Sequence, residues 1–189
     1  MARKVIYSMM VSLDGYIAGT DGTPDWGIVD EPIHRFAGDM FAELAMSVYG
    51  RRVYEAMSYW DTAEDDPDLQ DFMRDFAGLY TAHPKVVAST TLDAVGPNAR
   101  LLRGGGVEEV ARLKAEDGGP IGLAGATLAA SLIPAGLVDE YRPIIHPCAI
   151  GGGTPYLPAG VELAKLELLE TRTFPAGHVY LRYRDPNAR

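Results

Sequence analysis

The chain has 189 residues, 47% of them hydrophobic and 23% charged, which suits one globular domain spanning residues 1–189. Its formal net charge is −9 and no basic stripe interrupts this surplus, so we do not expect a nucleic-acid partner. No apolar run approaches the roughly 20 residues that cross a bilayer, no signal peptide precedes the first strand, and the one cysteine, Cys148, has no disulfide partner, so we expect a cytoplasmic protein.

A buried strand is predicted over residues 4–11, because most of them are apolar. It leads into a Gly-rich loop that contains Asp14, Asp21 and Trp26. Loops at strand ends often carry function in α/β proteins, so this loop is either a lid over a substrate or a plain surface excursion.

A helix is predicted over residues 31–44, with Pro32 in its first turn. Apolar residues recur in it at helical spacing: Ile33, Phe36, Ala37, Met40, Phe41 and Leu44. A short strand over residues 45–49 then ends at Gly50, and residues 51–57 form the next predicted helix.

Arg51 and Arg52 lie in the first turn of that helix. A cation there opposes the helix dipole and costs about 0.3 to 1 kcal/mol unless an anion is bound beside it. The pair therefore indicates a phosphate site, since a guanidinium binds phosphate through two hydrogen bonds. In the alternative interpretation, one arginine pairs with Glu55 and the other is solvated.

Residues 61–68 are predicted to be an acidic, solvated loop, and the apolar stripe over residues 69–79 a core helix. A third strand over residues 85–88 is followed by Ser89 and Thr90, whose hydroxyls either bind phosphate oxygens or cap the turn. A short strand over residues 100–102 and a helix over residues 107–113 come next. The glycines between them, residues 104–106, either cradle an anion or form a flexible loop.

A third junction of strand, glycine and helix lies at residues 120–133. An uncharged apolar run over residues 121–124 is typical of a strand buried on both faces. It meets Gly125, which permits a sharp turn and a close ligand approach, and Thr127 follows near the expected N-cap. The junction is either a seat for a phosphate group or an ordinary turn of an α/β domain.

The chain ends with a strand over residues 138–146, a Gly- and Pro-rich loop, and a hairpin of strands over residues 163–173 and 178–183. Repeated strand–helix units followed by a hairpin predict an α/β fold. We expect a mostly parallel, twisted sheet with helices on both faces, a three-layer sandwich, and an antiparallel pair at its C-terminal edge.

None of the usual catalytic motifs is present: the chain has no nucleophile elbow, no His-Glu pair at metal spacing and no long Walker-type loop with Lys. We interpret the four histidines, His34, His83, His146 and His178, as structural and expect no metal site. Strand ends that carry glycine, hydroxyl or arginine groups suit a long phosphorylated cofactor. In hydride transfer such a cofactor supplies the chemistry, so the missing nucleophile is compatible with a reductase.

Three segments occur in an order that is more specific than any one of them: residues 11–18 (VSLDGYIA), residues 50–55 (GRRVYE) and residues 136–153, which start with GLVDE and end in three glycines. Together they resemble the dihydrofolate-reductase-like family, typified by the reductase domain of bacterial riboflavin biosynthesis. The resemblance covers nearly the whole chain. It implies NADPH as the hydride donor, a small heterocyclic substrate of the pyrimidine, pterin or flavin kind, and a homodimer.

The resemblance also assigns roles to residues. It places Ile17 and Ala18 near the nicotinamide, and Asp14 and Trp26 beside the substrate, where Asp14 either contacts the substrate or holds its loop. It places Gly50, Arg51 and Arg52 at the cofactor phosphates, and Gly125, Ala126 and Thr127 at the pyrophosphate. Ser89 and Thr90 would lie near the adenosine 2′-phosphate. It further implies a candidate cis peptide bond between Ala124 and Gly125.

The chain departs from the family pattern at three points. Residues 34–36 offer no acid in register with the helix acid of true dihydrofolate reductases, and Tyr16 replaces the lysine usual in the riboflavin-pathway enzymes. The Cys-x-x-Cys of the accompanying deaminase is also missing. We therefore expect a stand-alone reductase related to 5-amino-6-(5-phosphoribosylamino)uracil reductase, with an altered substrate. The alternative is a non-catalytic nucleotide-binding or dimeric scaffold protein that retains the fold.

Overall fold

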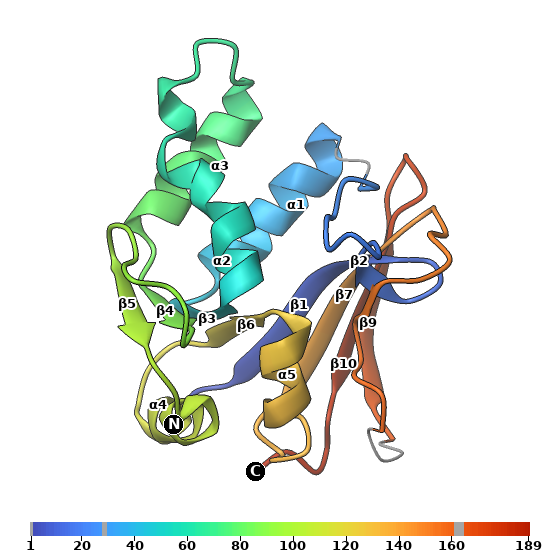
Figure 1. The fold of residues 1–189 in the computed structure, drawn as a ribbon. Coiled ribbons are helices and arrows are strands. Elements are labelled where there is room, and N and C mark those ends of the chain that lie inside the picture. Colours follow the sequence, from blue (N-terminus) through green and yellow to red (C-terminus); the bar gives the residue numbers. More distant parts are fainter. Residues whose placement is uncertain (1, 28–29, 161–164) are drawn as a thin grey trace.

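The computed structural model describes residues 2–27, 30–160 and 165–189. An eight-stranded sheet runs through it in the order β5-β4-β3-β6-β1-β7-β10-β9 (Figure 1). The strands are β1 (Val5–Ser12), β3 (Met46–Gly50), β4 (Lys85–Ala88), β5 (Ala99–Leu102), β6 (Ile121–Ala124), β7 (Glu140–His146), β9 (Glu167–Thr173) and β10 (Val179–Arg184). Neighbours from β5 to β7 pair in parallel, and β10 pairs antiparallel with both β7 and β9. The predicted sheet is thus confirmed, although residues 163 and 164 of the predicted hairpin lie outside the described residues.

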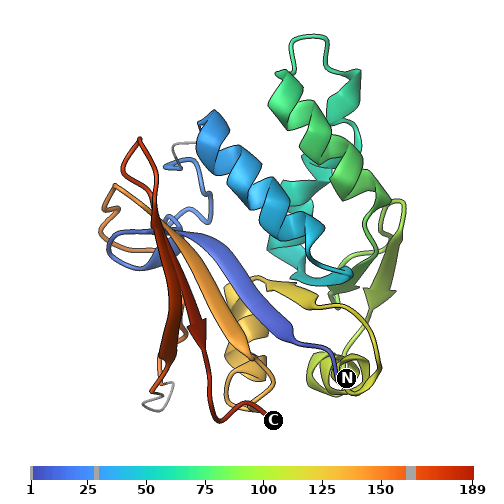
Figure 2. The same ribbon diagram turned by 180° about the vertical axis from the view of Figure 1, so that it is seen from behind.

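Helices cover both faces of the sheet, as Figures 1 and 2 show from opposite sides. One face carries α1 (Glu31–Ala42), α2 (Arg51–Met57) and α3 (Asp71–Ala82), and the other carries α4 (Gly106–Ala115) and α5 (Ala126–Leu132). Residues 61–68, the acidic segment expected to be a loop, contain the end of the 3₁₀ turn η1 (Ser58–Asp61) and the 3₁₀ turn η2 (Ala63–Asp65), and only the remainder of the segment is a loop. Within the described residues, no helix is long and apolar enough to cross a membrane.

The two faces hold separate cores because side chains alternate along each strand. On the side of α4 and α5, Tyr7 and Val48 pack into one core with Leu132. On the other side, Tyr49 and Val87 pack with aromatic side chains of α3. Burial on both sides explains why the central strands are short, nearly continuous apolar runs.

Local signals set where α1 begins. The Asp30 side chain accepts a hydrogen bond from the backbone N–H of Ile33 at 3.0 Å, and Pro32 occupies the first turn. Both features stabilise a helix start, because they satisfy or remove backbone donors that lack partners there. The helix then packs Ile33 against Ile144 and Tyr180 of β7 and β10.

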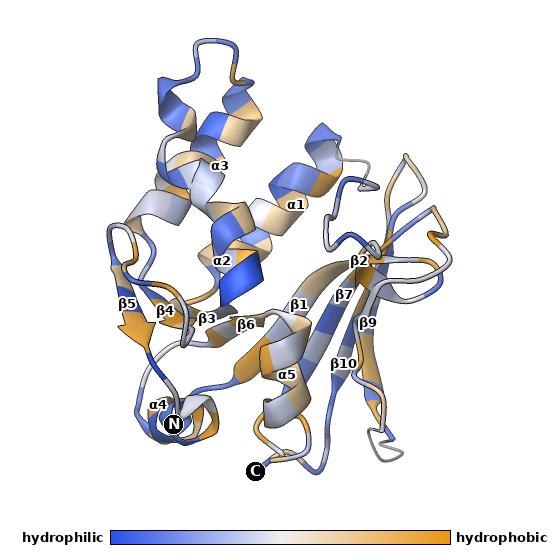
Figure 3. Ribbon diagram, in the orientation of Figure 1, coloured by the Kyte–Doolittle hydropathy of each residue, from blue (hydrophilic) through white to orange (hydrophobic). Residues whose placement is uncertain are grey.

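The carboxyl ends of the central strands meet at one edge of the sheet. In the strand register Gly50 lies beside Ala88, and Tyr49 beside Ala124, so the ends of β3, β4 and β6 are neighbours. Figure 3 shows the start of α2 as strongly hydrophilic beside largely hydrophobic strands. The parallel pairing therefore brings three of the predicted junctions together.

A second, small sheet lies beside this edge. It pairs β2 (Tyr16–Ala18) antiparallel with β8 (Thr154–Pro155). Both stretches were expected to be loops. They were missed because strands of three and two residues are too short to show a periodic pattern, and their partners are distant in the sequence.

Candidate functional site

A cleft of about 1190 Å³ opens at the carboxyl ends of β3, β4 and β6. All ten residues that the sequence predicted for a cofactor line it: Ile17, Ala18, Gly50, Arg51, Arg52, Ser89, Thr90, Gly125, Ala126 and Thr127. We call these ten residues the outer half of the cleft. They come from four separate segments of the chain, and the sheet brings them together.

The two arginines differ in their contacts. Arg51 forms an ion pair with Glu55 one turn along α2, with 3.2 Å between Nη1 and Oε1, which is the alternative that the sequence left open. No hydrogen bond or ion pair joins the exposed Arg52 to another described residue. The start of α2 also has no side-chain cap and no acid in its first turn. One guanidinium and several backbone donors are therefore left for an anion.

Gly125 sits where the starts of α2 and α5 approach each other. Its φ is +113°, and a Cβ at this position would lie 3.3 Å from the backbone nitrogen of Gly50. A glycine is required here by both conformation and space. Gly125 itself is the N-cap of α5, so Thr127 lies inside the first turn and not at the cap.

The peptide bond between Ala124 and Gly125 is trans, so the expected cis bond is wrong. The positive φ of Gly125 makes the turn from β6 into α5 without it.

The hydroxyl groups after β4 have different surroundings. Ser89 is buried, and its Oγ accepts hydrogen bonds from the backbone N–H groups of Thr91 and Leu92 at 3.2 and 3.0 Å. It thus caps the turn, as the second interpretation of these hydroxyls had it. Thr90 is exposed on the cleft wall.

The β2–β8 pair holds Ile17 and Ala18 against the cleft. Register partners are Tyr16 with Pro155 and Ala18 with Thr154. Behind them, the rings of Tyr7 and Tyr156 stack at 4.5 Å, and each hydroxyl donates to the backbone oxygen of the other residue. This buried stack ties the β8 loop to β1.

Asp14 and Trp26, the two residues expected beside the substrate, are not among those that line the cleft. The Asp14 carboxylate accepts hydrogen bonds from Ser12 Oγ and the backbone N–H of Gly151, both at 2.7 Å. The hydrogen bond from Ser12, together with those from the backbone of Gly151 and Ile150, lowers the pKa of Asp14. Asp14 therefore joins the loop after β1 to the loop that contains Gly151. Holding its loop was the other role that the sequence left open for it.

Trp26 packs edge-on against the buried ring of His146, with 5.4 Å between their centroids. The Trp26 indole N–H is buried and has no hydrogen-bond partner among the described residues. This contact anchors the loop that precedes α1 to the end of β7.

The cleft continues beneath α1 into a region that sequence reasoning did not predict. Its residues, which we call the inner half, include Ser8, Met10, His34, Phe41, Ser47, Trp60, Phe76 and Arg142. On α1, the cleft-lining residues His34, Ala37 and Phe41 follow helical spacing, so the apolar stripe of the sequence marked this face. The stripe alone does not tell a cleft wall from a packed core.

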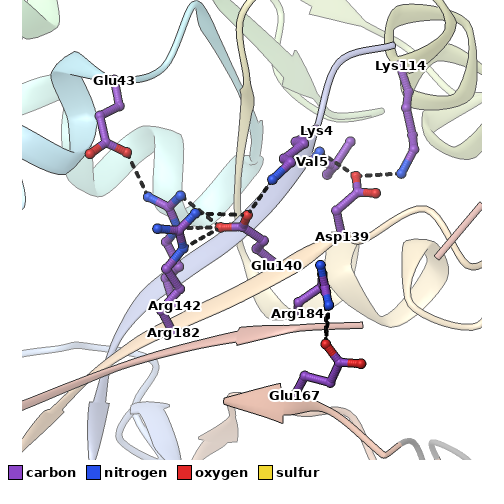
Figure 4. A network of polar contacts seen from close by, with 10 residues as sticks. All are labelled: Lys4, Val5, Glu43, Lys114, Asp139, Glu140, Arg142, Glu167, Arg182 and Arg184. Carbon is purple, nitrogen blue, oxygen red and sulfur yellow. Dashed lines mark hydrogen bonds and ion pairs between the residues drawn. The ribbon is translucent and has the colours of Figure 1, made fainter. Parts of the chain in front are cut away.

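Figure 4 shows a cluster of charges around the buried Glu140 and Arg142, and Arg142 also lines the cleft. Arg142 donates to Glu140 at 2.8 Å and to Glu43 at 2.9 Å, and Lys4 and Arg182 also bind Glu140, at 3.0 and 2.8 Å. Burial by itself would raise the pKa of Glu140, but the hydrogen bonds from Arg182, Arg142 and Lys4 outweigh it and lower the pKa to about 2. Arg142, which borders the cleft, is thus already bonded to two carboxylates.

Within the described residues, no group of three or more His, Cys, Asp or Glu side chains is placed to hold a metal ion. The cleft instead combines a rim of uncapped helix starts and arginines with an interior of apolar and aromatic side chains. This arrangement suits an elongated anionic ligand at the rim and a smaller apolar one inside.

Comparison with known proteins agrees with this geometry. A sequence model of the RibD C-terminal domain matches residues 3–180. The uncharacterized protein YyaP of Bacillus subtilis (strain 168) is 33% identical over 182 residues, which cover 96% of this chain and 94% of YyaP.

Two solved structures show the same fold. A putative riboflavin biosynthesis protein from Shewanella sp. PV-4 aligns with a TM-score of 0.69 at 21% identity, over 98% of this chain and 99% of its own. Dihydrofolate reductase from Enterococcus faecalis, solved with NADP(H), aligns with a TM-score of 0.64 at 16% identity and the same coverage of 98% and 99%. The chain therefore belongs to the RibD C-terminal domain family and has a dihydrofolate-reductase-like fold.

Proposed function

We propose that this protein is an NADPH-dependent reductase that acts on a small heterocyclic substrate. The observation that carries the proposal is the outer half of the cleft, where Arg52, which has no partner among the described residues, lies at the uncapped start of α2. Membership of the RibD C-terminal domain family supports a reductase. When bound, the dihydronicotinamide supplies a hydride, and the protein supplies binding and orientation.

The residues present fit such a cofactor. Gly50 and Gly125 let backbone come close to a pyrophosphate, because a Cβ on Gly125 would fill the space between the two turns. Backbone donors at the starts of α2 and α5, together with Arg52, would hold the phosphate oxygens. Thr90 and Ser89 would lie by the adenosine 2′-phosphate, and Ile17 and Ala18 by the nicotinamide. The apolar inner half is then left for the substrate.

Titration with NADPH, followed by nicotinamide fluorescence, tests the proposal. We expect saturable binding, and no saturation near millimolar cofactor would refute it. Arg52→Ala should weaken NADPH binding roughly tenfold, because a charge-assisted hydrogen bond is worth about 1.5 to 3 kcal/mol. Arg184→Ala, which removes an exposed pair with Glu167 on the terminal hairpin, is the matched control and should change the affinity less than twofold.

The same titration with Arg51→Ala separates two roles. If Arg51 contacts the 2′-phosphate, the variant should lose more affinity for NADPH than for NADH. Equal losses for both cofactors would assign it to the shared phosphates, and no loss for either would leave it as the partner of Glu55 alone.

A further inference from the structure

The inner half of the cleft contains polar side chains, but most of them are already bonded within the protein. Ser8 Oγ donates to the backbone oxygen of Arg142 at 3.0 Å, and Ser47 Oγ lies 2.9 Å from Nε2 of His83. The Arg142 guanidinium is held by Glu140 and Glu43. A ligand in this half therefore finds few groups that are free to bind it.

His34 is one exception among the described residues. It is only 7% exposed and borders the cleft, and no hydrogen bond joins its ring to another described residue. Three aromatic rings surround it: Phe72, Trp60 and Phe76, with centroids 5.1, 5.5 and 5.5 Å away. A buried polar group without a partner is rare in folded proteins, so it calls for a bound ligand or another explanation.

The aromatic surroundings restrict the protonation state and the tautomer of the His34 imidazole. Nδ1 is completely buried and has no hydrogen-bond partner among the described residues, so a proton on it would be an N–H donor without an acceptor. Burial, and secondarily the charge of Arg35, lower the pKa of His34, so the ring is neutral at pH 7. A proton on Nε2 instead leaves only an unpaired acceptor at Nδ1, which is tolerated better than an unpaired N–H, so the tautomer with its proton on Nε2 is favoured.

We infer that His34 is a specificity-determining residue that donates a hydrogen bond from Nε2 to an acceptor on an uncharged, planar substrate ring, and that the inner half disfavours phosphorylated substrates. This inference rests on the proposed reductase function, because it assigns the inner half to the substrate. Trp60 and Phe76 supply the flat apolar walls that such a ring needs.

The charges of the inner half explain why it disfavours phosphorylated substrates. A phosphate group there would need a free cation, since burying an unpaired charge is costly. Arg142 is the cation that borders this half, and its guanidinium already binds two carboxylates. A phosphate would have to compete with Glu140 and Glu43 for it.

Riboflavin and FMN form a suitable pair of probes, because they share one planar, fluorescent ring system with acceptor atoms and differ by a phosphate. We expect riboflavin to bind saturably, with its fluorescence changed on binding, and FMN to bind at least tenfold more weakly. Absence of riboflavin binding, or FMN binding equal to or tighter than that of riboflavin, would overturn the inference.

Two substitutions at His34 test its role as a donor. His34→Phe keeps an aromatic ring in the cage but removes the donor, and should weaken riboflavin roughly tenfold without lowering the unfolding temperature. His34→Gln restores an N–H and should remain within about threefold of the parent. Unchanged affinity in His34→Phe, or an equal loss in both variants, would overturn the assignment and leave His34 as a packing residue.

The NADPH titration on the same protein separates this inference from the function on which it rests. If NADPH binds and riboflavin does not, the inference fails and the reductase proposal stands. If riboflavin binds in a His34-dependent way and NADPH does not, the ring site is supported and the reductase function fails.

Discussion

Glu140 and Arg52 show two uses that this chain makes of charged residues. Glu140 is completely buried on β7, and three cations bind its carboxylate. Arg52 is exposed at the cleft and has no partner among the described residues. The first charge holds strands together, and the second remains available to a ligand.

The buried cluster makes a clear prediction about stability. Glu140→Gln should reduce the free energy of unfolding by about 3 to 5 kcal/mol, because the buried Arg142 loses one of its two carboxylates, which Lys4 and Arg182 also share. Glu167→Gln, which removes the exposed partner of Arg184 in the same region (Figure 4), should cost about 1 kcal/mol or less. Urea denaturation of both variants measures the difference, and equal losses would show that Glu140 contributes no more than a surface pair.

Single residues also mark how far the sequence could be interpreted. It offered two roles each for Arg51, Ser89 and Asp14, and in each case the contacts seen are the ones internal to the protein. Residue type and spacing could propose these roles but not choose between them. The choice depends on neighbours such as Gly151, which lies 137 positions from Asp14 in the chain.

Among the elements, junctions of strand, glycine and helix build the outer half of the cleft, and the β2–β8 pair closes it. The junctions were predictable, because a short apolar run, a glycine and a helical pattern follow one another directly. The β2–β8 pair was not, because its stability comes from contacts between distant segments. The dimer implied by the family stays a prediction, for which the exposed edge strand β9 offers a candidate surface.

The pairing of β2 with β8 requires a glycine at position 153. A Cβ at this residue would lie 2.0 Å from the backbone oxygen of Ala18, and its φ is +137°. Gly153→Ala should therefore separate β2 from β8, displace Ile17 and Ala18, and lower the unfolding temperature. NADPH affinity should fall with it, because these two residues border the cleft.

Gly151→Ala is the matched control in the same loop. Gly151 also has a positive φ, +77°, but nothing lies within 4 Å of a Cβ placed there. It should lose only about 1 to 2 kcal/mol from backbone strain. If both variants lost the same stability and affinity, the close approach to Ala18 would not be what holds the pair.

Burial lowers the pKa of three histidines among the described residues, His34, His83 and His146, and this makes the stability depend on pH. Burial lowers the pKa of His83 and of His146 to about 4, helped by the charge of Lys85 in the first case and of His178 in the second. In the unfolded chain both would titrate near 6.5. As the pH falls from about 6.5 towards 4, the unfolded state takes up protons that the native state does not. The free energy of unfolding therefore decreases in this window, and above it these histidines cause no loss.

We expect His83 and His146 each to cost on the order of 1 to 2 kcal/mol of stability at pH 5 relative to pH 7.5. Carboxylates with low pKa values, such as Glu140, contribute to acid sensitivity only below about 4.5, so the upper window reports the histidines. Unfolding temperatures across this range measure the slope. His146→Phe should remove part of the slope and leave the contributions of His83 and His34, and an unchanged slope would exclude His146 as a cause.

By itself, the sequence determined the α/β class and most elements of the sheet, because these follow from local periodicity. The family was identified from short ordered motifs, and that resemblance also named the ten residues of the outer half, which line the cleft and whose cofactor role stays a prediction. Tertiary structure alone decided that Arg51 pairs with Glu55 and that Asp14 joins two loops. It also decided that Arg52, and His34 in its cage of aromatic rings, have no hydrogen-bond partner among the described residues. Those outcomes depend on which distant side chains come within hydrogen-bonding or packing distance. The spacing of residues along one chain does not contain that information.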